Sequence, residues 1–175
     1  MKRLAALLLF VTALPCSAQT SKAAFAGGCF WSVESDLERV PGVIRIVSGY
    51  AGHRETVEVT YDPKKISYAQ LLDAFWHGVD PFDDAGQFCD RGGEYRSAVF
   101  VQDAAQKLAA ESSKRTLEQR FGKKIATEIL PATAFSPAEE EHQDYAKKNP
   151  IRYNLYRFNC GRDQRLAAVW GRTPH

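Results

Sequence analysis

Short apolar runs alternate with amphipathic segments along the chain, and this alternation predicts a domain of mixed strands and helices. The stretch from Glu55 to Tyr61 switches strictly between apolar and polar residues, which is typical of a strand with one buried face. Further strands are predicted over residues 23–26, 43–47, 97–101 and 124–130, and helices over residues 32–40, 67–79, 103–121 and 136–148.

The order of these elements predicts one α/β domain of the α+β plait type. Strand, helix, strand, strand, helix, a long loop over residues 80–93 and then a further strand are the order of a ferredoxin-like, split βαβ core. Two additional helices and one more strand follow, and an aromatic, Arg-rich tail after Pro150 is expected to be irregular.

The first 18 residues have the composition of a secretion signal. Lys2 and Arg3 precede an apolar run from Leu4 to Leu14 that is too short to span a bilayer. Small residues at Cys16-Ser17-Ala18 suit a signal peptidase, whereas Pro15 argues against a lipoprotein modified on Cys16. We therefore expect residues 1–18 to be removed and residues 19–175 to form a single exported, periplasmic or secreted, domain.

Composition narrows the classes of function. The 175-residue chain is 45% hydrophobic and 25% charged, with a formal net charge of +2, which suits a globular domain. Its basic residues are scattered, which argues against nucleic acid as a partner. No cluster of His and Cys has the spacing of metal ligands, so no metal site is expected.

Three cysteines remain once Cys16 is removed: Cys29, Cys89 and Cys160. An odd number in an exported protein leaves at least one free or exchanging thiol, which favours redox chemistry over a structural disulfide framework.

Cys29 has the most distinctive surroundings. Two glycines precede it, and Phe30 and Trp31 follow it at the predicted start of a helix. Unpaired backbone N–H groups and the helix dipole at such a position favour a thiolate, the nucleophilic form of cysteine. The alternative is a buried structural cysteine in an apolar turn.

Many motifs along the chain resemble those of the peptide methionine sulfoxide reductase A family. The likeness spans residues 23–171 and is carried by these stretches: Gly28-Cys29-Phe30-Trp31, Leu37 to Gly49, His53-Arg54-Glu55, Tyr61-Asp62-Pro63, Phe75-Trp76, Asp80-Pro81, Asp90, Glu94-Tyr95-Arg96-Ser97, Pro137-Ala138-Glu139-Glu140, His142-Gln143, Arg152-Tyr153, Asn159-Cys160-Gly161-Arg162-Asp163 and Trp170-Gly171.

The resemblance implies a role for each matching site residue. Cys29 would attack the sulfoxide sulfur, Glu55 would protonate the oxygen, and Tyr95 would hydrogen-bond that oxygen. Asp90 would fix the substrate and the loop, and Phe30 with Trp31 would hold the substrate methyl group. The family reduces the S epimer of methionine sulfoxide, free or in proteins. Glu34 and His142 are expected to be structural.

The resemblance also implies how the enzyme is regenerated. Cys29 becomes a sulfenic acid, which a second thiol converts into a disulfide that a thioredoxin-like protein or another dithiol reduces. Cys160 is the favoured resolving thiol, and Cys89 is the alternative, either resolving the sulfenic acid itself or relaying to Cys160. No bound cofactor, no membrane contact after signal cleavage and a monomeric state are expected.

One departure from the family is a shortened loop before His53, where members usually carry a second tyrosine for the sulfoxide oxygen. Tyr50 lies on the other side of the gap and is not assigned that role, and the short loop threatens the position of Glu55. A catalytically weakened family member that binds oxidised methionine or a partner protein is therefore the alternative function. A general thiol–disulfide oxidoreductase would carry Cys-x-x-Cys, which this chain lacks.

Overall fold

The computed structural model describes residues 19–171, so the predicted signal peptide lies outside the described residues. The elements run in this order: β1 (Ser21–Ala26), α1 (Phe30–Leu37), β2 (Val43–Ala51), β3 (Arg54–Tyr61), α2 (Tyr68–His77), β4 (Gly86–Gln87), β5 (Asp90–Arg91), the 3-10 turn η1 (Gly93–Tyr95), β6 (Ala98–Val101), α3 (Ala104–Phe121), β7 (Glu128–Pro131), β8 (Phe135–Pro137), η2 (Glu140–His142), α4 (Tyr145–Lys148), α5 (Pro150–Asn159) and α6 (Arg162–Trp170).

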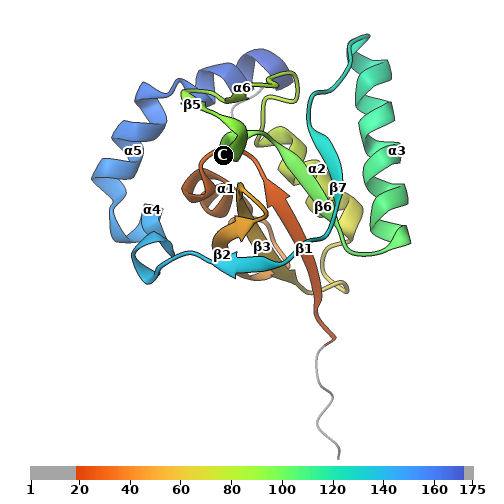
Figure 1. Ribbon diagram of the computed structural model, residues 1–175, viewed down its shortest axis with the longest axis horizontal. Helices are drawn as coiled ribbons and strands as arrows, with labels where there is room; N and C mark the ends of the chain where they lie inside the picture. Colours follow the sequence, from red (N-terminus) through yellow and green to blue (C-terminus); the bar gives the residue numbers. More distant parts are fainter. Residues whose placement is uncertain (1–18, 172–175) are drawn as a thin grey trace, which may run out of the picture.

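The main sheet has the strand order β7-β6-β1-β3-β2-β8 (Figure 1). Its four central strands, β6-β1-β3-β2, pair antiparallel in the order of a split βαβ plait, while β7 adds parallel to β6. The predicted fold class is confirmed.

The main core lies between the sheet and the helices α1 and α2. Val57 and Val59 of the alternating strand are fully buried, and the rings of Phe25 and Phe75 stack with centroids 4.7 Å apart. A capping box of Ser67 and Gln70 starts α2, close to the predicted beginning of the helix over residues 67–79. The opposite face of the sheet carries a smaller cluster of mostly small residues, Ala26, Ala51, Ala98 and Phe100.

The helix predicted over residues 136–148 is wrong. Residues 135–137 form β8 at the sheet edge, and only the short turns η2 and α4 follow. The reason is competition from the sheet, because the Gln143 amide exchanges hydrogen bonds with the Ser48 backbone and the Ala138 N–H donates to the Ser48 carbonyl. These long-range bonds replace the helical ones.

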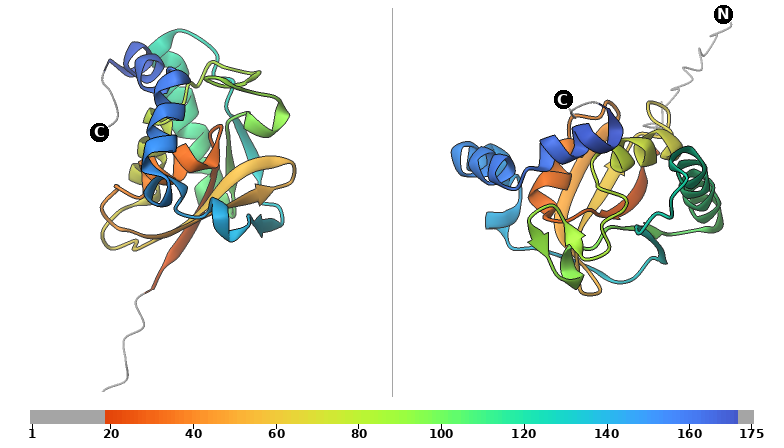
Figure 2. Two further views of the ribbon diagram at one scale, coloured as in Figure 1. Left: turned by 90° about the vertical axis from the view of Figure 1, so that its left-hand side faces the viewer. Right: turned by 90° about the horizontal axis from the view of Figure 1, so that it is seen from above.

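The expectation of an irregular tail is also wrong, because residues 150–159 and 162–170 form α5 and α6. Partly buried ion pairs hold them against α1: Asp36 accepts from Arg157 at 2.8 Å and from Arg162 at 3.3 Å. Figure 2 shows α3 and α5 at opposite sides of the molecule with α6 between them.

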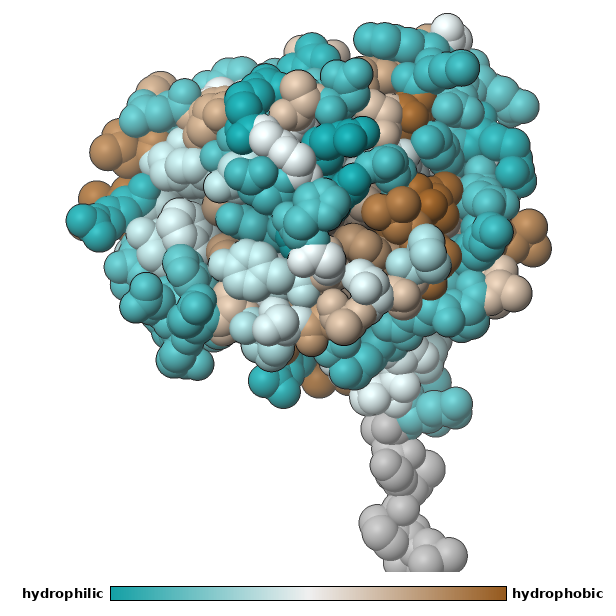
Figure 3. Space-filling model, viewed as in Figure 1, coloured by the Kyte–Doolittle hydropathy of each residue, from teal (hydrophilic) through white to brown (hydrophobic). Residues whose placement is uncertain are grey.

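The surface seen in Figure 3 is mostly hydrophilic, with an apolar patch beside β6 and β7. Among residues 19–171, no helix is long and apolar enough to cross a membrane.

Candidate active site

Cys29 lies in a tightly packed turn between β1 and α1. Gly28 has φ +83°, and a Cβ there would lie 2.6 Å from the Cβ of Gln87, so only glycine suits the position. Gln87 is fully buried and is held by two 2.8 Å bonds to the Asp80 backbone. The buried Arg162 guanidinium donates to the carbonyls of Gly27 and Gly78. The turn that positions the sulfur is therefore fixed from both sides.

Glu55 occupies the start of α1. The Phe30 N–H donates to Glu55 Oε2 at 2.9 Å, so this carboxyl takes one of the free helix N–H groups that were expected to favour a Cys29 thiolate. Burial, with a smaller contribution from the charge of Glu55, raises the pKa of Cys29 to about 12. The ligand-free protein therefore carries Cys29 as a thiol, against the expectation of a thiolate.

Burial also raises the pKa of Glu55 to about 7, against the lowering effect of the Phe30 N–H bond. The charges of Asp90 and Glu94 add to the rise. A carboxyl with this pKa is protonated in about half of the molecules at neutral pH, as proton donation requires.

Asp90 and Tyr95 lie beside these two groups. Asp90 begins β5, and Tyr95 ends the η1 turn that follows. Burial and the charges of Glu55 and Asp90 raise the pKa of the Tyr95 phenol, with a smaller effect of Cys29. The structure thus brings the four residues Cys29, Glu55, Asp90 and Tyr95 together from distant parts of the chain.

Tyr156 of α5 is a site residue that sequence reasoning missed. Its hydroxyl donates to Asp90 Oδ2 at 2.5 Å and also lies within hydrogen-bonding contact of the Cys29 sulfur. Burial is the main cause that raises the pKa of this phenol far above its usual range. The aromatic composition of the tail was the only sequence feature that pointed to Tyr156. Because the tail was expected to be irregular, nothing in the sequence placed Tyr156 beside Cys29.

Cys89 and Cys160 are joined by a disulfide, and Cys29 is the free cysteine of the described residues. The bond links the β4–β5 hairpin to the C-terminal end of α5. Cys89 directly precedes Asp90, and the Cys160 N–H donates to the carbonyl of Tyr156, the residue whose hydroxyl bonds Asp90. The three thiols named from the sequence are therefore part of one site.

Phe30 and Trp31 form an aromatic wall with three further rings. Trp31 stacks on Tyr145 at 3.7 Å and lies 5.8 Å from the ring of His142. Phe30 contacts the rings of His142 at 5.6 Å and Tyr50 at 5.7 Å. Trp31 Nε1 and His142 Nδ1 are buried without a hydrogen-bond partner among the described residues. His142, which was expected to be structural, therefore packs on this wall.

The short loop before His53 is a two-residue hairpin connection. Ala51 pairs with Arg54, and Gly52 at φ +62° makes the turn with His53. The hairpin leaves Glu55 bonded to α1, so the shortening does not displace this carboxyl.

Glu34 carries out the structural role expected of it. Its buried carboxyl accepts from the Ser48 hydroxyl at 3.2 Å and the Asp144 N–H at 3.2 Å, and burial raises its pKa to about 7. Glu34, Glu38 and Asp144 also have oxygens close enough to hold a cation, but the Lys147 ammonium bonds Glu38 at 2.6 Å and Asp144 at 2.8 Å. The Lys147 ammonium thus supplies the positive charge beside Glu38 and Asp144.

Comparisons with known proteins agree with this geometry. Residues 21–174 match the family model described as peptide methionine sulfoxide reductase. The chain is 47% identical over 170 residues to peptide methionine sulfoxide reductase MsrA 2 of Caulobacter vibrioides, covering 87% of each chain. It is 43% identical over 169 residues to MsrA of Bacillus licheniformis, covering 86% of this chain and 93% of that one. Among solved structures, reduced Mxr1 of Saccharomyces cerevisiae superposes with a TM-score of 0.72 at 30% identity, covering 76% of this chain and 87% of that one.

Proposed function

The chain belongs to the peptide methionine sulfoxide reductase A family and reduces methionine sulfoxide, and we propose that it acts on the S epimer through Cys29. The observation that carries this proposal is the placement of Cys29, the free thiol of residues 19–171, beside a carboxyl of pKa about 7 at the edge of an aromatic wall. The aromatic wall can pack against the methyl group of the substrate, and the carboxyl can donate its proton to the sulfoxide oxygen.

The first step is transfer of the oxygen from the substrate to Cys29. The sulfur of Cys29 attacks the sulfoxide sulfur while Glu55 protonates the oxygen, and the S–O bond breaks. The thiol and the sulfoxide become a sulfenic acid and methionine, so the methionine sulfur gains the two electrons that the Cys29 sulfur loses. The Cys29 thiol, which is protonated before the attack because its pKa is about 12, gives up its proton as its sulfur takes the oxygen, and this proton restores Glu55. Tyr95 hydrogen-bonds the oxygen, and Asp90 orients the site through Tyr156.

The second step moves the oxidation away from Cys29. One thiol of the Cys89 and Cys160 pair attacks the sulfenic acid and releases water, and the other displaces Cys29 from the mixed disulfide. The products are a Cys89–Cys160 disulfide and a free Cys29 thiol. A disulfide between these two cysteines, with Cys29 free, supports the relay rather than a single resolving thiol.

An external dithiol then reduces the Cys89–Cys160 disulfide, and we propose a thioredoxin-like protein as this donor. Cys89 is exposed, so an incoming thiolate has access to its sulfur. The yeast relative Mxr1 has been solved in complex with Trx2. Residues 1–18 support export, so the substrates we propose are oxidised proteins of the cell envelope, repaired by a monomeric enzyme.

Stereochemistry tests the proposal. Purified S and R epimers of a blocked methionine sulfoxide are each given to the reduced protein with dithiothreitol, with Cys29→Ser as the control. Methionine formed from the S epimer alone, and none from the variant, is the expected result. Equal turnover of the R epimer, or turnover that survives Cys29→Ser, would overturn the assignment.

A further inference from the structure

The β2–β3 hairpin places an additional phenol beside the catalytic carboxyl. In the antiparallel register, Tyr50 pairs directly with Glu55. Directly opposed residues of an antiparallel pair project from the same face of the sheet, with Cβ atoms about 4.5–5.5 Å apart. Glu55 projects toward the start of α1, so Tyr50 projects toward it as well.

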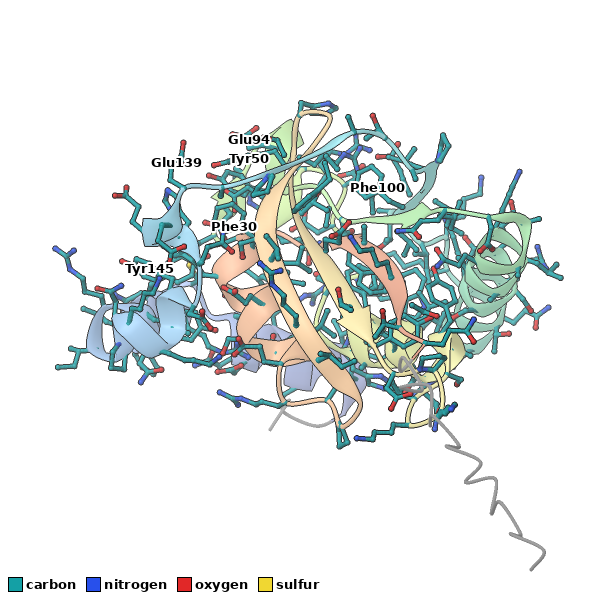
Figure 4. The ribbon with its side chains drawn as sticks, turned by 90° about the horizontal axis from the view of Figure 1, so that it is seen from below. Phe30, Tyr50, Glu94, Phe100, Glu139 and Tyr145 are labelled. Carbon is teal, nitrogen blue, oxygen red and sulfur yellow. A yellow bond between two sulfur atoms is a disulfide. The ribbon has the colours of Figure 1, made fainter. Side chains whose placement is uncertain are left out.

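Ring contacts locate the Tyr50 side chain more closely. Its ring lies 5.7 Å from that of Phe30 at an angle of 58°, and the N–H of Phe30 is the group that binds Glu55. Figure 4 shows Tyr50, Phe30 and Glu94 at one end of the hairpin. Tyr50 is 37% exposed, so its phenol is supported by Phe30 on one side and open to an incoming molecule on the other.

The hydroxyl of Tyr50 is available for a substrate. Within residues 19–171 neither the Tyr50 hydroxyl nor the Tyr95 hydroxyl forms a hydrogen bond, whereas the Tyr156 hydroxyl is engaged with Asp90. Burial and the charges of Glu55 and Glu139 raise the pKa of Tyr50, so at neutral pH it is a protonated donor. Tyr50 and Tyr95 are thus two phenols without a hydrogen-bond partner among the described residues, and the charge of Glu55 raises the pKa of both.

We propose that Tyr50 is a catalytic residue that donates a hydrogen bond to the sulfoxide oxygen, beside Tyr95 and Glu55. The oxygen gains negative charge as the S–O bond breaks, and fixed donors aimed at it stabilise that charge. The two-residue turn makes Tyr50 and Glu55 the second pair from the tip of the hairpin. This inference rests on the proposed function and extends it to the residues that bind the oxygen.

The test compares Tyr50→Phe with the wild type in single turnover. Fully reduced protein is mixed with a saturating concentration of the S epimer of a blocked methionine sulfoxide, and methionine is followed in time. The Phe variant keeps the ring on Phe30 and removes only an exposed hydroxyl. Tyr68→Phe is the matched control, since the Tyr68 hydroxyl is buried without a partner among the described residues and lies by the opposite end of β1, near Ser21.

We expect Tyr50→Phe to slow methionine formation about 10- to 100-fold, less than the roughly 10²- to 10³-fold loss for one donor, because Tyr95 and Glu55 still bind the oxygen. Its KM should change much less, and alkylation of Cys29 by iodoacetamide should stay within twofold of the wild type. A rate within twofold of the wild type, or an equal loss in Tyr68→Phe, would overturn the assignment. A loss of Cys29 alkylation as large as the loss of rate would also overturn the assignment, because the substitution would then act on the thiol and not on the oxygen. Failure of the wild type itself to form methionine would instead refute the proposed function.

Discussion

Replacing Glu55 by Gln separates the two things this side chain does. The amide oxygen of Gln still accepts the Phe30 N–H, which the Glu55 carboxyl accepts at 2.9 Å, so the start of α1 keeps its cap. The proton that the carboxyl delivers to the sulfoxide oxygen is lost. A decrease in rate with unchanged stability would therefore report on proton transfer.

The structure sets the size of the effect. The pKa of Glu55 is raised from 4.5 to about 7, mainly by burial. This shift corresponds to about 3 kcal/mol against the charged form. A carboxyl at 4.5 would be protonated in about 0.3% of molecules at pH 7, whereas one at about 7 is protonated in about half, a gain of roughly 150-fold in the acid form. Loss of a positioned acid costs about 10²- to 10⁴-fold, so we expect Glu55→Gln to slow single turnover by that factor.

The assay is single turnover from pH 5 to 9, with methionine measured by quenched flow. For the wild type, the plot of log rate against pH should change slope near pH 7, because Glu55 titrates there. In Glu55→Gln this change of slope should be absent and the rate uniformly low. A variant that keeps the wild-type rate, or that keeps the break near pH 7, would refute the assignment of Glu55 as the acid.

Other substitutions test the surroundings of the site. Tyr156→Phe removes a hydrogen bond that lowers the pKa of Cys29, so alkylation of the reduced protein at pH 8 should slow about tenfold, and an unchanged rate would contradict the contact. Glu34 has a folded pKa raised from 4.5 to about 7, so the folded state binds its proton more tightly and loses stability as pH rises from about 4.5 to above 7. Glu34→Gln should reduce that loss by up to about 3 kcal/mol in urea unfolding at pH 5 and 8, and an equal pH dependence in both proteins would contradict it. Arg162→Ala should lower the free energy of unfolding by about 3–5 kcal/mol, because it leaves Asp36 and two buried carbonyls short of a donor, and a loss below 1 kcal/mol would contradict this role.

The central fold was predictable because its signals are local. The alternation from Glu55 to Tyr61, the capping box at Ser67 and the glycine at 122 that ends α3 each act within a few residues. The helix expected over residues 136–148 failed because Gln143 and Ala138 bond the distant Ser48 instead of their own helix. The helices of the tail depend on ion pairs with Asp36, more than 100 residues earlier in the sequence.

The site shows the same division. Cys29, Glu55, Asp90 and Tyr95 were identified because each stands in a short linear motif, and the structure places them together. Tyr156 and Tyr145 were missed because they belong to the segments whose structure is set by long-range contacts. The state of Cys29 could not be judged from its place at a helix start, since burial and the Glu55 carboxyl outweigh the favourable end of the helix.

The relay through Cys89 and Cys160 is tested most directly by counting products in the absence of any reductant. Fully reduced protein from residue 19 onward is given one equivalent of the S epimer of a blocked methionine sulfoxide, after which methionine, free thiols and disulfide-linked peptides are measured. The account predicts that two thiols are lost, that the disulfide joins Cys89 to Cys160, and that Cys29 remains open to alkylation. One methionine per chain is expected, because with one equivalent of substrate none remains to oxidise Cys29 once the relay has restored it. A final disulfide that contains Cys29, or a thiol loss with no methionine formed, would contradict it.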